Sequence, residues 1–139
     1  GEVRFSPYGY IDMLHDKKLT AEQLVNYLTK NKLERIDWGI LDDENGEPIL
    51  LTAQEYFKKF VYDVDFLNAP NLSLNKTISS GNSLNNIDLV YGNCTYVEFY
   101  FPGFEEKYDG MDWRSLKLVF EKQDNKLFLI GVVHDQWTI

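Results

Sequence analysis

Two aspartates and one histidine are the residues of this sequence best suited to acid–base chemistry. Asp63 and Asp65 stand two positions apart, so an extended backbone would place both carboxylates on one side. Two carboxylates that face one pocket can share a proton or hold one pKa high, as general acid–base catalysis requires. His134 has an ordinary pKa close to neutrality and would act with them. The candidate catalytic group is therefore His134 with Asp63 or Asp65.

The same residues also have a structural interpretation. The two aspartates could instead bind backbone N–H groups, or Arg114, at a corner of the fold. His134 shares a predicted strand face with Phe128, Ile130 and Val132, which would place it at the end of an apolar row. A histidine there would need only one hydrogen bond and would belong to the rim of the core.

The neighbouring His134 and Asp135 do not make a catalytic dyad on a regular strand. Adjacent side chains of a strand point to opposite faces, so Asp135 cannot orient His134 unless a bulge lies near Gly131. The carboxylate partner of His134 should therefore come from another part of the chain.

Aromatic residues indicate a second kind of site, a ligand-binding cavity. The chain contains three Trp, nine Tyr and nine Phe, which is more than a small core requires. Rings with polar tips suit a cavity for a small hydrophobic ligand. We assign the lining of this cavity to Tyr10, Trp38, Tyr62, Tyr100 and Trp113. The alternative is that these rings build a large aromatic core.

Length and charge restrict the class of protein. A chain of 139 residues is sufficient for one domain, which we expect to span residues 1–139. The 14 Lys and Arg against 22 Asp and Glu give a formal net charge of −8. No basic stripe is present, and binding to nucleic acid requires one. No apolar run approaches the roughly 20 residues that cross a bilayer, so no transmembrane segment is expected.

No motif for a cofactor or a metal occurs in the sequence. Phosphate-binding glycine loops, zinc-protease helices and cysteine clusters are all absent. The lone Cys94 lacks a second cysteine at metal or redox spacing, and His15 is the only other histidine. We therefore predict neither a cofactor nor a metal site.

Capping signals predict two helices. Thr20 with Gln23, and Thr52 with Glu55, have the spacing of a capping box. The first helix should run from about residue 21 to 31, and the second should begin directly after Thr52. Residues 33–51 read as a hairpin because two apolar runs flank a polar turn that contains an Asn-Gly pair.

The remaining segments favour strands. Residues 3–11 read as an edge strand that runs into a turn, and residues 67–86 as a long loop with a short strand near Thr77. Residues 96–101, 115–120 and 127–137 alternate like sheet strands, with a tight turn at 123–126. Helices followed by an antiparallel meander predict an α+β fold, in which two or three helices cover a strongly curved antiparallel sheet.

This order of elements resembles the nuclear-transport-factor-like, or cystatin-like, cone. The chain is similar over nearly its whole length to a family of exported or lipid-anchored bacterial domains without an assigned reaction. The phrases that carry this resemblance are residues 3–8, 38–39, 56–66, 110–116 and 130–139. It implies a cone with a pocket at its open end and an envelope or extracellular location. The broader fold begins with a long helix; either that helix lies outside these residues, or the helix after Thr20 replaces it.

Three functions follow as hypotheses. The first is a non-catalytic domain of an exported protein that binds a small hydrophobic ligand or an envelope protein through its aromatic cavity. The alternative is a small cofactor-independent enzyme, similar to the isomerase and cyclase members of the broader fold, that uses Asp63 or Asp65 with His134. A third is an assembly role, in which a sheet face or Trp137 supports a homodimer.

Overall fold

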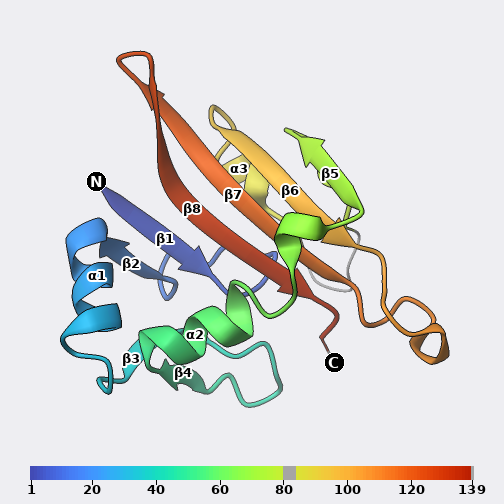
Figure 1. Ribbon diagram of the computed structural model, residues 1–139, viewed down its shortest axis with the longest axis horizontal. Helices are drawn as coiled ribbons and strands as arrows, with labels where there is room; N and C mark the ends of the chain where they lie inside the picture. The colour runs from blue at the N-terminus through green and yellow to red at the C-terminus, as the bar shows by residue number, and fades with distance from the viewer. Residues whose placement is uncertain (80–83, 139) are drawn as a thin grey trace.

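The computed structural model describes residues 1–79 and 84–138 and shows an α+β fold (Figure 1). A six-stranded sheet has the order β2-β1-β8-β7-β6-β5, and β3 and β4 form a separate hairpin. The strands are β1 (Glu2–Ser6), β2 (Lys17–Thr20), β3 (Ile36–Ile40), β4 (Pro48–Leu51), β5 (Asn71–Leu74), β6 (Thr95–Phe101), β7 (Arg114–Gln123) and β8 (Lys126–Gln136). The helices are α1 (Ala21–Thr29), α2 (Ala53–Phe60) and α3 (Ile87–Val90), with short 3-10 turns η1 (Phe66–Asn68) and η2 (Glu106–Tyr108).

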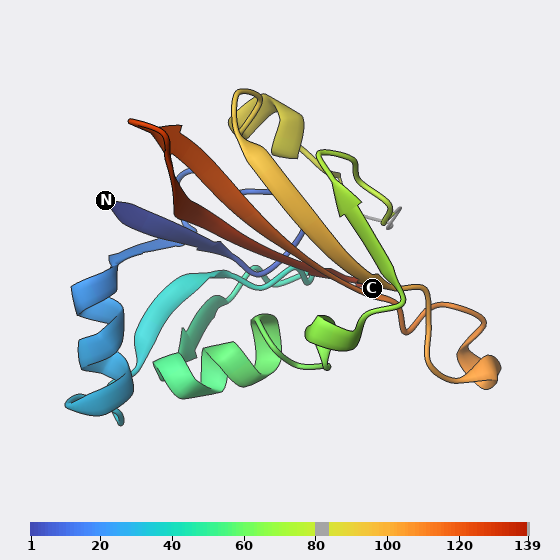
Figure 2. The same cartoon turned by 45° about the horizontal axis from the view of Figure 1, so that its top comes forward.

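The large sheet is mixed and open. Its neighbouring strands are antiparallel except for β1 and β8, which run parallel. The edges are β2 and β5, and the sheet is twisted but neither closed nor strongly curled (Figure 2). The prediction that residues 3–11 form an edge strand is wrong. Strand β1 lies between two partners because residues 17–20 return beside it as β2.

Both predicted capping boxes are confirmed. Thr20 accepts from the backbone of Gln23 at the start of α1, and Thr52 accepts from that of Glu55 at the start of α2. The hairpin between them is also confirmed as β3 and β4. In its turn Gly46 has a φ of 58°, a left-handed conformation that glycine adopts without strain.

The stretch predicted as a long loop is more structured than its sequence suggests. Strand β5 occupies residues 71–74 and pairs with β6, so the expected short strand near Thr77 is misplaced. Its alternating leucines, Leu72 and Leu74, are both exposed at the sheet edge. Helix α3 begins directly after this stretch, at Ile87, and was not predicted. Residues 80–83 lie outside the described residues.

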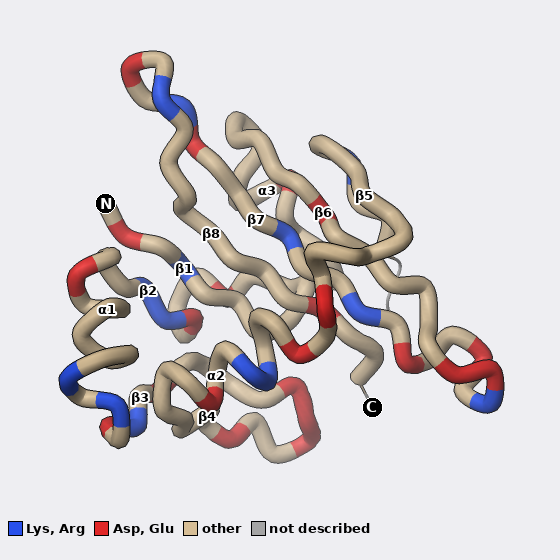
Figure 3. Tube along the Cα trace, viewed as in Figure 1, with Lys and Arg blue, Asp and Glu red and all other residues tan. Residues whose placement is uncertain are grey.

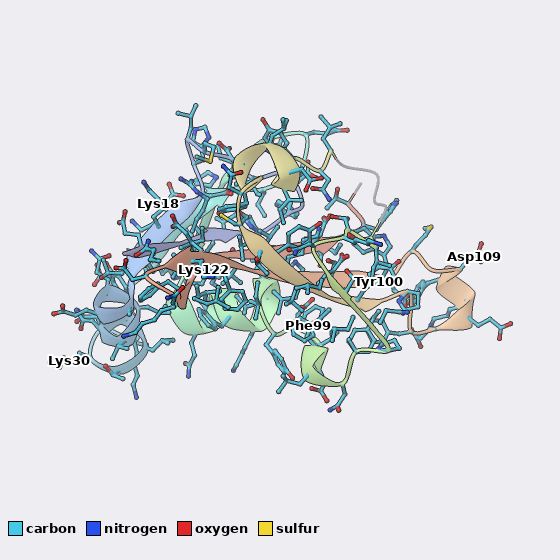
Figure 4. The ribbon with its side chains drawn as sticks, turned by 90° about the horizontal axis from the view of Figure 1, so that it is seen from above. Lys18, Lys30, Phe99, Tyr100, Asp109 and Lys122 are labelled. Carbon is cyan, nitrogen blue, oxygen red and sulfur yellow. The ribbon has the colours of Figure 1, made fainter. Side chains whose placement is uncertain are left out.

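The two faces of the large sheet are covered by different elements. One face packs on α2 and on the β3–β4 hairpin, which lie beneath the sheet in Figure 2. Its core includes Trp38, stacked on Tyr56 with ring centroids 4.1 Å apart. The other face is covered by α3 and by the loop after β1, through Ile87 and Ile11. Consecutive residues of each strand therefore enter two separate environments; Phe99 and Tyr100 of β6 are an example (Figure 4).

Candidate functional site

His134 and Asp63 meet, together with Arg114, where α2 ends beside β7 and β8. His134 Nε2 lies 2.9 Å from Asp63 Oδ1, and Arg114 Nε donates to Asp63 Oδ2 at 3.0 Å. His134 Nδ1 lies 3.2 Å from the carbonyl oxygen of Pro7. Burial acts to raise the pKa of Asp63, but the hydrogen bond from His134 and the charges of His134 and Arg114 outweigh it and lower that pKa. We call His134, Asp63 and Arg114 the His134 cluster.

The His134 cluster is closed to solvent at the histidine. The His134 side chain has no exposed surface, and the rings of Phe60 and Phe66 meet it edge-on with centroids 5.9 and 6.3 Å away. Both oxygens of Asp63 and both ring nitrogens of His134 already face protein atoms. A general base must reach a substrate proton. The arrangement joins the end of α2 to the sheet and leaves no atom of His134 open to a substrate.

Asp65 is separate from this cluster. Its carboxylate accepts from the Tyr62 hydroxyl at 2.5 Å and from the Asn68 side chain at 2.6 Å. The bond from Tyr62 is the main cause of the lowered pKa of Asp65. The two aspartates therefore do not face a common pocket, because η1 begins directly after Asp65 and turns it toward its own loop.

The five aromatic residues assigned to one cavity lie in separate places. Trp38 is entirely buried in the core below the sheet, whereas Tyr62 is exposed beside its own loop. Tyr100 and Trp113 contact each other, with ring centroids 6.3 Å apart. Tyr10 is half exposed and lines a cleft that none of the other four reaches. The bulk of the aromatic surface contributes to packing.

The cleft at Tyr10 is built from four chain segments. It encloses about 600 Å³ between the loop after β1, the end of β3, Leu84 from the segment before α3, and the C-terminal segment. We call it the Tyr10 cleft, and its lining comprises Pro7, Tyr8, Tyr10, Asp12, Asp16, Ile40, Leu41, Asp42, Leu84 and Thr138. Tyrosine rings and aliphatic side chains alternate there with carboxylates, a combination that suits an amphipathic ligand.

Asp16 is the buried carboxylate of the Tyr10 cleft. It is only 8% exposed, and its Oδ2 accepts from Ser6 Oγ at 2.5 Å and from the Asp12 N–H at 2.9 Å. Burial raises the pKa of Asp16 to about 6, although those hydrogen bonds and the charge of Arg4 oppose the shift. The sequence did not single out Asp16, because its partners are Ser6 of β1 and the backbone of Asp12 in its own loop.

The raised pKa of Asp16 predicts a pH-dependent stability. Between the ordinary aspartate pKa of 3.8 and about 6, the folded chain keeps a proton that the unfolded chain has lost. The free energy of unfolding should therefore fall as the pH rises through this window, by on the order of 2–3 kcal/mol. Asp16→Asn should flatten that decline. Urea unfolding at pH 4, 5, 6 and 7 measures it, and an unchanged profile in Asp16→Asn would contradict the assignment.

A second charged cluster lies on the face of the sheet opposite the His134 cluster. Glu98 of β6 accepts from Ser115 Oγ at 2.6 Å, and Lys117 Nζ lies 3.8 Å from the same carboxylate oxygen. The backbone N–H of Ile78 also donates to Glu98, at 2.5 Å. Glu98 and Lys117 are almost completely buried, and Asp135 of β8 contributes a further charge that Lys117 faces. Burial lowers the pKa of Lys117, while the carboxylates Glu98 and Asp135 oppose that shift.

Other kinds of site find little support in the described part of the chain. Within residues 1–79 and 84–138 no three His, Cys, Asp or Glu side chains converge as a metal site. No helix there is long and apolar enough to cross a membrane. Lys and Arg occur as short separate segments, and residues 42–44 in the turn after β3 form an acidic run (Figure 3).

Comparison with known proteins gives no relative from which to transfer a role. No protein-family model, curated protein or solved structure matches this chain.

Proposed function

We propose that this protein is a non-catalytic binding domain that holds a small amphipathic ligand in the Tyr10 cleft. The observation that carries the proposal is the lining of the cleft, where Tyr8, Tyr10 and aliphatic residues surround the buried Asp16. Its volume of about 600 Å³ falls within the range of small-molecule sites, roughly 300–1,000 Å³. The ligand is thus a small molecule with an apolar body and at least one polar group.

The proposal extends to fold relationship and location. We propose that the sheet is an open variant of the nuclear-transport-factor-like cone, because α2 and the β3–β4 hairpin pack on one of its faces. We further propose an exported, envelope-associated protein, on the resemblance of its sequence phrases to exported bacterial domains. A homodimer through the exposed Trp137 is compatible with this role.

A cofactor-independent enzyme is the second candidate, and one contact favours it. His134 Nε2 and Asp63 Oδ1 are 2.9 Å apart, a distance typical of an acid–base pair. The complete burial of His134 opposes it, since a reacting atom would have to displace Phe60 or Phe66. The binding role needs no such rearrangement and is the better supported of the two.

Native mass spectrometry of protein purified from its own host tests the binding role. We expect wild-type protein to carry a co-purifying small molecule that Tyr10→Ala loses, because the substitution removes one wall of the cleft. Tyr108→Ala is the matched control, since Tyr108 is similarly exposed, at 44% against 51% for Tyr10, but lies in η2 outside the cleft. An identical adduct on wild type, Tyr10→Ala and Tyr108→Ala would contradict the proposal.

A further inference from the structure

The Tyr10 cleft has a one-sided distribution of charge. Three of its lining residues are the carboxylates Asp12, Asp16 and Asp42, and none is a lysine or an arginine. The nearby Arg4 is turned toward the protein, where its guanidinium donates to carbonyl oxygens of the loop after β1 at 3.4 to 3.5 Å. The charge that a ligand meets at the lining is therefore negative.

The three carboxylates differ in the contacts that they already make within the protein. Asp12 contacts His15 Nδ1 at 2.8 Å, and Asp42 accepts from Thr138 Oγ at 2.8 Å. Asp16 is more than nine-tenths buried, and the two hydrogen bonds that its carboxylate accepts from described residues both go to Oδ2. No hydrogen bond from a described residue reaches Asp16 Oδ1. With respect to the described residues, Asp16 Oδ1 therefore keeps the capacity to accept a hydrogen bond from a bound donor.

The walls around these carboxylates favour a cation over a neutral donor. Tyr8 and Tyr10 contribute aromatic rings, whose faces attract positive charge. Ile40, Leu41 and Leu84 contribute apolar surface for the rest of the ligand. A carboxylate or phosphate in the same place would be repelled by Asp16 and would find no lysine or arginine in the lining.

We propose that the ligand of the Tyr10 cleft is a small organic ammonium ion with an apolar body, and that Asp16 is its counter-ion. The inference rests on the proposed binding function and adds the chemical class of the ligand. The ammonium group would pair with the Asp16 carboxylate, and the apolar body would lie against the two tyrosines. At pH 7.5 Asp16 carries its negative charge, because its pKa of about 6 lies below that pH.

Isothermal titration calorimetry with three probes of similar size tests this chemistry. The probes are 2-phenylethylammonium, 2-phenylethanol and 3-phenylpropionate at pH 7.5. We expect the ammonium to bind about tenfold more tightly than the alcohol, or better, and the carboxylate to bind least. Raising the salt concentration should weaken only the ammonium complex, since salt screens the pairing of opposite charges.

Two aspartate variants distinguish a specific role of Asp16 from a general effect of the net charge of the protein. Asp16→Asn should weaken the binding of 2-phenylethylammonium by about tenfold and leave the binding of 2-phenylethanol unchanged. The substitution removes the charge of the side chain and keeps its shape. Asp109→Asn removes the same charge from the outer loop between β6 and β7 (Figure 4) and should change neither affinity. Circular dichroism of both variants verifies that they are folded.

Other results would contradict specific parts of the proposal. If 2-phenylethanol binds as tightly as the ammonium and Tyr10→Ala abolishes both, the cleft binds ligands but the inference of a cation is wrong. If Asp16→Asn leaves the ammonium affinity unchanged, Asp16 is not the counter-ion. If no probe binds, both the inference and the proposed function fail for this class of ligand. Tighter binding of an N-acetyl-lysine amide would assign the cation to a partner protein and overturn the small-molecule source.

Discussion

Lys117→Met should lower the free energy of unfolding by about 3–5 kcal/mol, the largest effect that the structure predicts for a single substitution. The side chain of Lys117 is 1% exposed, and its ammonium group lies 3.8 Å from Glu98 Oε2. Methionine keeps most of the volume but leaves Glu98 and Asp135 buried without a cation. Urea unfolding followed by circular dichroism measures the change.

The same strand provides the control for Lys117. Lys122→Met makes an identical chemical change at an exposed position near the end of β7, where the β7–β8 hairpin extends beyond the neighbouring strands (Figure 1). It should change the unfolding free energy much less. Combining Lys117→Met with Glu98→Gln should restore part of the loss, because the uncompensated carboxylate is neutralised. Equal effects of Lys117→Met and Lys122→Met would show that the buried pair is not formed.

Asp63→Ala should have the second-largest effect and should lower the free energy of unfolding by about 2–4 kcal/mol at pH 7. It removes the acceptor of both His134 and Arg114, and His134 has no access to water that could replace the lost contact. The lowered pKa of Asp63 means that its stabilisation exists above the ordinary pKa of 3.8 and disappears as the pH falls through the folded value. The difference in the free energy of unfolding between wild type and Asp63→Ala should therefore become smaller at acidic pH.

Asp65→Ala is the matched control for Asp63→Ala. Asp65 lies two residues further on, is exposed, and bonds only within its own loop through Tyr62 and Asn68. We expect a much smaller loss of stability from it. If Asp65→Ala proved as damaging as Asp63→Ala, the His134 cluster would not be what joins α2 to the sheet.

The elements that depend on local signals could be predicted from the sequence. Thr20 and Thr52 start helices because a capping box needs only four consecutive residues. The turn between β7 and β8 places Asp124 and Asn125 at positive φ, which these two residues tolerate better than most. Strand alternation also placed His134 and Asp135 in different environments, as the structure shows.

The elements and sites that depend on distant partners could not be predicted in the same way. Residues 17–20 contain two lysines and one leucine, and they become a strand only because β1 is there to pair with them. Asp16 looks like an ordinary loop carboxylate until Ser6 and the backbone of Asp12 enclose it. Glu98 was not selected either, although a charge between Tyr96 and Tyr100 on one strand face is a signal that could have indicated it.

The central claim is that the Tyr10 cleft is the ligand site, and chemical-shift mapping tests it most directly. A fragment mixture of small amphipathic compounds is titrated into uniformly ¹⁵N-labelled protein, and the amide shifts are followed residue by residue. We expect the largest shifts to cluster at Tyr8, Tyr10, Asp16 and residues 40–42, and we expect Tyr10→Ala to abolish them. Shifts centred on the His134 cluster or on the loop between β6 and β7, or an absence of shifts at the cleft, would contradict it.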